Sequence, residues 1–210
     1  MKCRDERSFN NDKEALIAMD NKDTNIMIAW CITGSGDRIE ECVDFMKELK
    51  RKYNLDVHVY ISKEGATVLK FYKLFKAVKD EFPRVSVEKG PNAPFLAGRI
   101  QLGRYDFLLI APATANTVAK IAHGIADTLV TNAAAQAMKV DVPVYIFPVD
   151  QKEGEIITKL PDGRSLKLRI RKEDVANVDK LRRMRGITVL GEVQEIEEVL
   201  SVKLKDVYLN

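Results

Sequence analysis

The stretch YDFLLIAPATANTVAKIAHGIADTLVTNAAAQAM, residues 105–138, decides how the rest of the chain is arranged. It begins with an apolar run over residues 107–111, short enough for a strand buried on both faces, and it breaks at Pro112. A helical pattern follows from Val118 to Gln136. We therefore expect a loop at the carboxyl end of a buried parallel strand, where open α/β sheets bind their ligands.

That loop is small and polar. Thr114, Asn116 and Thr117 offer hydroxyl and amide groups, while Ala113 and Ala115 allow a flat molecule to approach the backbone closely. A strand-to-helix junction also needs an N-cap, so one of the three polar residues could serve only that purpose. Capping explains one polar residue and leaves the others for a ligand.

Strands and helices alternate along residues 25–150. We expect strands near residues 25–31, 55–62, 85–87, 107–111 and 142–149, with helices near 37–52 and 68–78. This alternation predicts an α/β fold, a Rossmann-like or flavodoxin-like doubly wound parallel sheet with helices on both faces. Right-handed crossovers would bring Gly34, Ser62 and Thr114 to one edge of the sheet.

The pattern changes after Asp150. Two strands around the turn at residues 161–164, PDGR, predict a β-hairpin, followed by a helix over about 173–185, a short strand and a last amphipathic segment. We expect residues 1–24 to be an N-terminal extension and residues 25–210 to be a single domain. Within that domain we distinguish a core (25–150), a projecting hairpin (151–172) and C-terminal helices (173–210).

Composition excludes several classes of protein. The 210 residues are 46% hydrophobic and 31% charged, and a net charge of +3 is too small to argue for a nucleic-acid partner. No apolar run reaches the roughly 18 residues needed to span a membrane, and the N-terminus is too polar for a signal peptide, so we expect a cytoplasmic protein. Cys3, Cys31 and Cys42 form no CxxC pair, so any redox chemistry needs a bound organic cofactor.

Gly34, Ser35 and Gly36 lie between a predicted strand and a predicted helix. Glycines let backbone N–H groups face a phosphate, and a helix N-terminus adds its positive dipole end. The spacing of a dinucleotide site and the lysine of a Walker loop are both absent, so a mononucleotide-like cofactor suits this turn better than NAD. His58 and His123 have no metal-ligand partner nearby in sequence, and we expect packing roles for both and no metal site.

Positive charge is concentrated between Lys152 and Arg185, where eleven basic residues accompany six acidic ones. The simpler interpretation is a solvated surface, which such charge runs usually are. The alternative is a docking face for an acidic protein.

The run APATANTVAKIAHGIADTLVT, residues 111–131, closely resembles the signature of the flavin-binding family named for homo-oligomeric flavin-containing cysteine decarboxylases. That family includes phosphopantothenoylcysteine decarboxylase, flavin prenyltransferase and the archaeoflavoproteins. The ITGSG turn at residues 32–36 and Ser62 fall where the family places other contacts to FMN, so the resemblance covers about residues 25–150.

The resemblance implies FMN as the cofactor and a homo-oligomer built from trimers, with FMN near the subunit interfaces. It places Gly34, Ser35 and Gly36 on or near the phosphate side, with Ser62 nearby. The remaining implied contacts line the flavin or approach it from the following helix: Thr114, Ala115, Asn116, Thr117, Ala133, Ala134, Ala135 and Gln136.

Two departures from the family pattern argue against decarboxylation. Arg99 occupies the place of the catalytic histidine of the decarboxylases, and an arginine stays protonated, so it is no ordinary proton shuttle. Residues 147–151, FPVDQ, replace their Pro-x-Met-Asn substrate clamp. The changed segments resemble the archaeoflavoprotein branch instead, whose members look like electron carriers that accept electrons from ferredoxin.

We therefore expect an FMN-containing redox protein that exchanges electrons with ferredoxin or a similar acidic iron-sulfur protein. The basic side chains of the predicted hairpin are the candidate docking surface: Lys159, Arg164, Lys167 and Arg169. The alternative is an FMN-dependent reductase of a pterin-like substrate, similar to dihydromethanopterin reductase, with Arg99 anchoring an anionic group. A flavin storage protein is a third possibility, and a decarboxylase ranks last.

Overall fold

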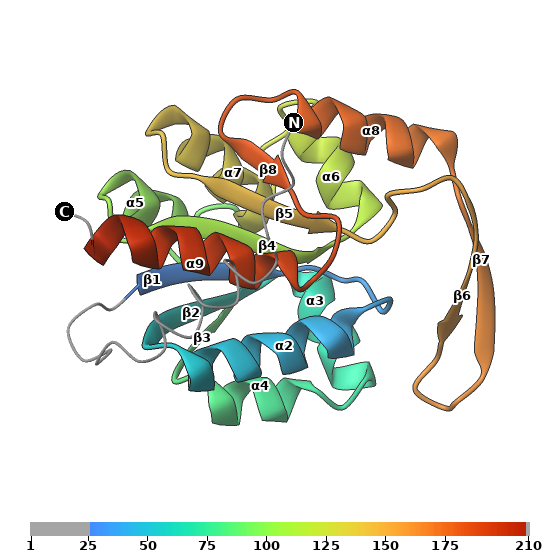
Figure 1. The fold of residues 1–210 in the computed structure, drawn as a ribbon. Coiled ribbons are helices and arrows are strands. Elements are labelled where there is room, and N and C mark those ends of the chain that lie inside the picture. The colour runs from blue at the N-terminus through green and yellow to red at the C-terminus, as the bar shows by residue number, and fades with distance from the viewer. Residues whose placement is uncertain (1–25, 209–210) are drawn as a thin grey trace, which may run out of the picture.

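The structure, a computed structural model, describes residues 26–208, so the predicted extension over residues 1–24 lies outside the described residues. A central sheet of parallel strands runs through this part of the chain (Figure 1). The strands are β1 (Ile26–Ile32), β2 (Leu55–Ile61), β3 (Arg84–Val87), β4 (Phe107–Ala113), β5 (Val144–Pro148) and β8 (Ile187–Val189).

The spatial order of the strands is β3-β2-β1-β4-β5-β8. The chain builds outward from β1 to one edge of the sheet, and then crosses back to β4 and builds toward the other edge. The order therefore reverses between β1 and β4, and a crevice opens outside the carboxyl ends of these two strands. The predicted doubly wound α/β fold is confirmed.

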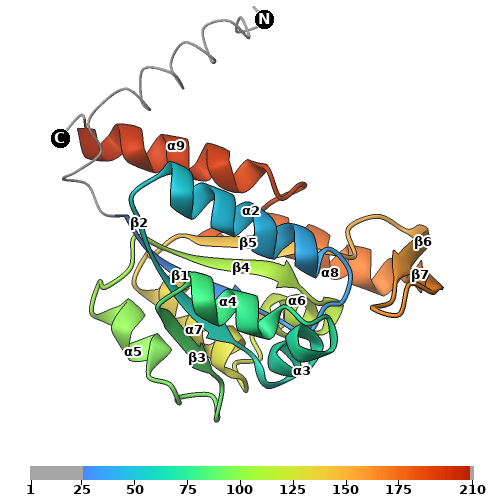
Figure 2. The same ribbon diagram turned by 90° about the horizontal axis from the view of Figure 1, so that it is seen from below.

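Helices cover both faces of the sheet (Figure 2). One face packs against α2 (Ile39–Lys52), α3 (Lys63–Phe71), α4 (Phe75–Glu81) and α9 (Glu195–Tyr208). The other packs against α5 (Leu96–Gln101), α6 (Ala115–Ala122), α7 (Leu129–Lys139) and α8 (Lys172–Arg182).

Alternating side chains of each strand enter two separate hydrophobic cores. In β1, Ile28 and Trp30 point to the α2 side, whereas Ala29 and Cys31 point to the α7 side. The indole N–H of Trp30 donates to the carbonyl of Ala111, 2.8 Å away, which ties the side chain of β1 to β4. All seven residues of β4 are buried, as the continuous apolar run predicts.

Two predicted helices are each broken in the structure. The segment expected as one helix over residues 68–78 divides into α3 and α4 at Lys73, whose φ of 59° is left-handed. The segment expected as one helix from Val118 to Gln136 divides into α6 and α7, because Gly124 has a φ of 71° and Thr128 starts a new helix with a capping box. The second break gives α7 an N-terminus of its own, capped by Thr128.

Helix α2 begins at Ile39, two residues after the predicted start near Asp37. Arg38 precedes it in a left-handed conformation, with a φ of 56°. Its guanidinium pairs with Glu41 at 2.6 Å and Glu192 at 2.7 Å, and it lies 4.8 Å from the centre of the Phe147 ring. The contacts with Glu192 and Phe147, which lie far away in the sequence, stabilise the conformation of Arg38 in which the helix starts late.

The predicted hairpin is present as β6 (Gly154–Lys159) paired antiparallel with β7 (Ser165–Ile170). It projects from the side of the sheet at which α3 and α6 begin (Figure 1). The hydroxyl of Tyr72, at the end of α3, donates to the carbonyl of Lys159 at 3.1 Å and ties the hairpin to the body of the protein. The division into a core, a hairpin and C-terminal helices remains a prediction.

No helix among the described residues is long and apolar enough to cross a membrane.

Gly65 supplies a test of how closely α3 approaches the sheet. A Cβ at this position would lie 2.6 Å from the carbonyl oxygen of Ile32. We expect Gly65→Ala to lower the free energy of unfolding by about 1–3 kcal/mol, although alanine favours helices, because the clash involves backbone. Urea unfolding followed by Trp30 fluorescence measures the loss.

Gly90→Ala is the matched control, because a Cβ at Gly90 meets no atom within 4 Å. It should change the free energy of unfolding by less than about 0.5 kcal/mol. Equal effects of the two substitutions would contradict the close contact between α3 and β1.

Candidate functional site

Thr33 joins the two strands that flank the crevice. Its hydroxyl donates to the carbonyl of Pro112 at 2.8 Å and accepts from the backbone N–H of Thr114 at 3.0 Å. The side chain is 2% exposed, so these bonds lie in a nearly water-free environment and hold the end of β1 against the end of β4.

A cavity of about 430 Å³ opens at this edge of the sheet, and we call it the crevice cavity. Its volume lies within the range of roughly 300–1,000 Å³ that is typical of small-molecule sites. Five residues predicted from the sequence meet in its wall: Gly34, Ser62, Thr114, Asn116 and Thr117. Gly34 is required here, since a Cβ would lie 2.8 Å from the Cβ of Glu64.

Three helices begin at the crevice cavity. Ser62 caps α3 by accepting from the N–H of Gly65 at 2.9 Å, and Thr114 caps α6 by accepting from the N–H of Thr117 at 3.2 Å. Thr128 caps α7 in the same way. Because a helix N-terminus carries partial positive charge, the cavity favours an anionic group.

The polar loop after β4 serves both of the roles expected from the sequence. Thr114 is the N-cap, and its hydroxyl also donates to the hydroxyl of Thr117 at 3.1 Å. The exposed amide of Asn116 bonds to no other described residue, so it is available to a ligand. Capping therefore accounts for Thr114 and much of Thr117, while Asn116 remains a binding group.

Two lysines and three acidic side chains, Glu64, Glu88 and Asp127, complete the polar wall. Lys120 pairs with Asp127 at 2.9 Å, whereas Lys63 has no carboxylate partner among residues 26–208. The carboxylate of Glu88 is buried, and it accepts from the backbone N–H of Lys63 at 3.1 Å and of Leu129 at 2.8 Å. Lys63 is thus the cation most available to a bound anion.

A second cavity of about 250 Å³ adjoins the first and shares Gly34 and Thr114 with it; we call it the hairpin cavity. Ser35 and Gly36 face this second cavity instead of the first. Gly36 is held against Tyr72, since a Cβ there would lie 2.5 Å from the tyrosine hydroxyl. The predicted glycine turn therefore separates two spaces.

One face of the hairpin forms the apolar wall of the hairpin cavity, through Ile156, Leu160, Leu166 and Leu168. Asp37 and Asp150 stand on the other side. Burial, together with the nearby carboxylates of Asp174 and Asp37, raises the pKa of Asp150.

The remaining predicted flavin contacts line neither cavity. Ala133 and Ala134 are buried in the core below α7, and the side-chain oxygen of Gln136 accepts from Gln101 at 2.9 Å. Ala115 and Ala135 are half-buried. A role for these residues in binding stays a prediction.

Arg99 also lies outside both cavities, on the exposed side of α5. Hydrogen bonding to Tyr105, with Tyr60 nearby, raises the pKa of its guanidinium. The Tyr105 hydroxyl bonds in turn to Tyr60 at 2.7 Å and to His58 Nδ1 at 2.9 Å. His58 is therefore a packed sheet residue, as its sequence context indicates.

The second histidine, His123, lies at the end of α6, where Nε2 is 3.1 Å from the amide oxygen of Asn177. Within residues 26–208 no cluster of His, Cys, Asp and Glu side chains has the geometry of a metal site. Cys31 and Cys42 are buried and unpaired, and burial raises the pKa of both thiols, so they stay protonated.

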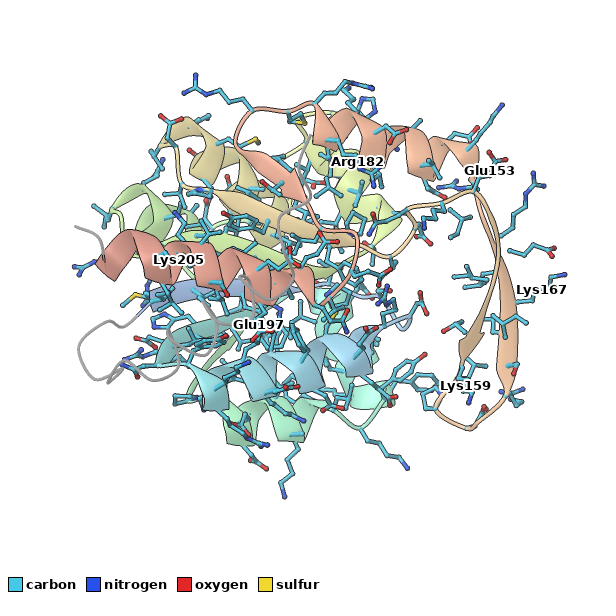
Figure 3. The ribbon with its side chains drawn as sticks, in the orientation of Figure 1. Glu153, Lys159, Lys167, Arg182, Glu197 and Lys205 are labelled. Carbon is cyan, nitrogen blue, oxygen red and sulfur yellow. The ribbon has the colours of Figure 1, made fainter. Side chains whose placement is uncertain are left out.

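The basic side chains of the hairpin point away from the hairpin cavity. Lys159, Lys167 and Arg169 alternate with the cavity-facing residues, and Lys167 extends outward from the hairpin (Figure 3). Lys167 pairs with Glu155 at 2.7 Å and Arg164 pairs with Asp162 at 2.7 Å. Lys159 and Arg169 have no such partner in the described chain, so they carry the unneutralised charge of this face.

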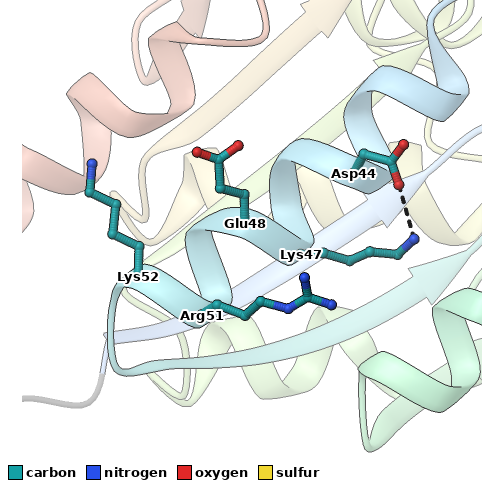
Figure 4. Close-up of a pocket in the computed structure, with 5 residues that line it drawn as sticks. All are labelled: Asp44, Lys47, Glu48, Arg51 and Lys52. Carbon is teal, nitrogen blue, oxygen red and sulfur yellow. Dashed lines mark hydrogen bonds and ion pairs between the residues drawn. The ribbon is translucent and has the colours of Figure 1, made fainter.

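A larger hollow of about 640 Å³ lies over the exposed side of α2 (Figure 4). Its described lining comes from one helix: Asp44, Lys47, Glu48, Arg51 and Lys52. Lys47 pairs with Asp44 at 3.0 Å, and Arg51 and Lys52 pair with Glu81 and Glu197 of neighbouring helices, so these charges already have partners within the protein. The crevice cavity is the better candidate because residues from five separate segments meet there.

Sequence patterns missed Lys63 and Glu88 of the crevice cavity, and they included Thr33 only as part of the ITGSG turn without giving it a role. Lys63 follows Ser62 directly at the end of β2, a position that could have drawn attention to it. Glu88 carries no local signal, since its partners lie 25 and 41 residues away.

Comparison with known proteins identifies close relatives. The family model described as Flavoprotein matches residues 16–206. An uncharacterized protein of Methanocaldococcus jannaschii is 57% identical over 175 residues, which are 83% of this chain and 94% of that protein. The dihydromethanopterin reductase (acceptor) of the same organism is 32% identical over an alignment that covers 85% of this chain and 97% of the enzyme.

A solved structure has a similar fold. DmrB of Burkholderia xenovorans, in complex with FMN and described as a cubic protein cage for redox transfer, superposes with a TM-score of 0.74. The two chains are 31% identical, and the alignment covers 88% of this chain and 98% of DmrB.

Removal of the Thr33 hydroxyl tests its role in the crevice. Thr33→Val preserves shape but leaves the N–H of Thr114 without its acceptor, so we expect a loss of about 1–3 kcal/mol in the free energy of unfolding. Hydrogen exchange at the Thr114 amide should also become faster. Thr67→Val, which alters an exposed hydroxyl on α3, is the control and should change stability by less than about 0.5 kcal/mol. Unchanged exchange at Thr114 would refute the role.

Proposed function

Because this chain belongs to the flavoprotein family, we propose that it is an FMN-dependent oxidoreductase that reduces a planar, pterin-like acceptor. The family predicted from the sequence is confirmed by the family model, which covers residues 16–206. The observation that carries the proposal is the pair of adjoining cavities that share Gly34 and Thr114. One is polar and suits a flavin nucleotide, and the other has an apolar wall.

The donors of the crevice cavity fit FMN. Its phosphate would be held by the helix N-termini, the Ser62 hydroxyl and the unpaired ammonium of Lys63. Asn116 would bond to the ring or to the ribityl chain, with Thr114 and Thr117 beside it, and Ser35 and Gly36 would face the ring from the hairpin cavity. The FMN complex of DmrB supports this assignment.

Homo-oligomerisation would complete the flavin site. Ala115, Ala135 and Gln136 line neither cavity of a single chain but keep exposed surface, and a neighbouring copy is the means by which they would reach a flavin. Arg99 would likewise meet an anionic group of the substrate only across such an interface. Ala133 and Ala134 would support the site from the core, where they are buried. The cage described for DmrB supports such an assembly, and a trimer as its building unit is part of the proposal.

The hairpin cavity suits the acceptor. Leu166 and Leu168 are 38% and 42% exposed, so they offer apolar surface to a flat ring. No described group donates to the carboxylate of Asp150, which leaves it available to N–H groups at a pterin edge. A relative named dihydromethanopterin reductase supports a substrate of this class.

The chain's own groups would supply orientation and a proton. A bound FMN provides the electrons for reduction of the acceptor. The hairpin would shield one side of the space from water. Asp150, whose pKa is raised by burial, would take up a proton from solvent at its carboxyl oxygen and pass it to the acceptor nitrogen.

The outward face of the hairpin would receive the electron donor. Lys159 and Arg169 give it unpaired positive charge beside the exposed Ile157. A small acidic iron-sulfur protein such as ferredoxin is complementary to this face, and its electrons would enter next to the hairpin cavity. A purely electron-carrying role, without a small-molecule acceptor, is the second candidate and rests on this face alone.

Substitution of the hairpin's inner face tests the acceptor site. The FMN-loaded protein is reduced with dithionite under anaerobic conditions and mixed with 7,8-dihydropterin, and reoxidation of the flavin is followed by absorbance. Leu168→Ser should raise the dihydropterin concentration for half-maximal rate about tenfold, because apolar contact area is lost. FMN affinity should stay unchanged.

Ile157→Ser is the matched control, because Ile157 lies on the outward face of the same hairpin and is 73% exposed. It should leave the half-saturating concentration of dihydropterin unchanged. Equal effects of both substitutions would contradict an acceptor site inside the hairpin cavity, and absence of reoxidation in the wild type would favour the electron-carrier role.

Charge reversal on the outward face tests the docking surface. Lys159→Glu combined with Arg169→Glu should slow flavin reduction by an acidic ferredoxin about tenfold at low salt, because electrostatic steering is lost. The difference should disappear at about 0.5 M salt, where screening shortens the Debye length. Lys139→Glu, an exposed change on α7, is the control and should have no effect. Wild-type reduction that does not depend on salt would refute electrostatic docking.

A further inference from the structure

Glu88 is a buried carboxylate with no part in the function proposed above. It follows β3, and only 8% of its surface is exposed. One carboxylate oxygen accepts from the N–H of Lys63, the first residue of α3, at 3.1 Å. The other accepts from the N–H of Leu129, the first residue of α7, at 2.8 Å. One side chain thus spans the N-termini of two helices.

This arrangement makes a buried charge tolerable. A carboxylate removed from water needs hydrogen bonds and positive charge to replace its hydration. Two backbone donors and the positive ends of two helix dipoles provide both. The backbone N–H of Glu88 also donates to the carbonyl of Ile61 at 2.8 Å, so the residue is fixed to the end of β2.

Glu88 belongs to the wall of the crevice cavity, together with Ser62 and Thr128, which cap the same two helices. Because the side chain is buried, water screens its charge only weakly. The pKa of the Cys31 thiol, inside β1, is raised first by burial and second by the negative charge of Glu88. The negative charge of this carboxylate therefore acts on a group inside β1, near the end of the strand that borders the crevice.

We propose that the buried negative charge of Glu88 lowers the midpoint potential of the bound flavin. Reduction adds negative charge to the flavin, and a fixed carboxylate in a low-dielectric wall opposes that charge. The oxidised flavin is therefore held more tightly than the reduced one, which makes the reduced protein a stronger reductant. The inference rests on the proposed binding of FMN in the crevice cavity.

The test compares Glu88→Gln with the wild type. Glutamine keeps the shape and one acceptor for the helix N–H groups but removes the charge. FMN affinity is measured by fluorescence titration, and the midpoint potential by anaerobic spectroelectrochemistry. We expect the ratio of affinities for reduced and oxidised FMN to rise at least about tenfold, a positive shift of about 30 mV for two electrons.

Glu64→Gln is the matched control. Glu64 lines the same cavity but is exposed, so water screens its charge, and the affinity ratio should change less than about twofold. Equal shifts for Glu64→Gln and Glu88→Gln would overturn the special role of the buried carboxylate, as would an unchanged potential in Glu88→Gln.

Glu88→Asp keeps the test decisive if the glutamine variant fails to fold. It retains the charge and loses one methylene, so stability should fall while the affinity ratio stays within about threefold of the wild type. A larger change would mean that cavity shape, not charge, sets the potential, and would overturn the inference. Failure of the wild type to bind FMN would instead refute the proposed function, which separates the two outcomes.

Discussion

The hydrogen bonds of the Thr33 hydroxyl hold together the part of the sheet on which everything else depends. The hydroxyl donates to the carbonyl of Pro112 at 2.8 Å and accepts from the backbone N–H of Thr114 at 3.0 Å. These two bonds join the ends of β1 and β4. The strand order reverses at this place, so the connections leave the two strands toward opposite edges and a crevice opens between them. Both cavities include Thr114 in their walls, and their geometry therefore depends on this one buried contact.

Electrostatics at the crevice are balanced by groups of the protein itself. Helices α3, α6 and α7 direct their positive ends at the cavity, and the caps Ser62, Thr114 and Thr128 satisfy part of their N–H groups. The carboxylate of Glu88 accepts from the first N–H group of α3 and of α7. The remaining positive potential and Lys63 suit a phosphate, while the buried carboxylate opposes extra negative charge elsewhere in the site.

The hairpin uses the two-residue period of a strand to present different chemistry on its two sides. Leu166 and Leu168 face the hairpin cavity, while Lys159, Lys167 and Arg169 face outward. In the function proposed above, a small flat molecule would meet the apolar side and an acidic protein would meet the basic side. The contact of Tyr72 with Lys159 fixes the hairpin in this orientation.

The sequence by itself determined the features that depend on local pattern: the buried strand β4, the polar loop from Thr114 to Thr117, the hairpin turn and the alternation of an α/β fold. These follow from hydrophobic periodicity and turn residues, which neighbouring positions encode. Tertiary structure alone decided the late start of α2, where Arg38 meets Glu192, and the bridge of Glu88 between α3 and α7. It also placed Gly34 in the walls of both cavities and Ser35 and Gly36 in the wall of the hairpin cavity alone. Each of these contacts joins residues that only the packing of helices on the sheet brings within reach, and local patterns carry no information about such distant partners.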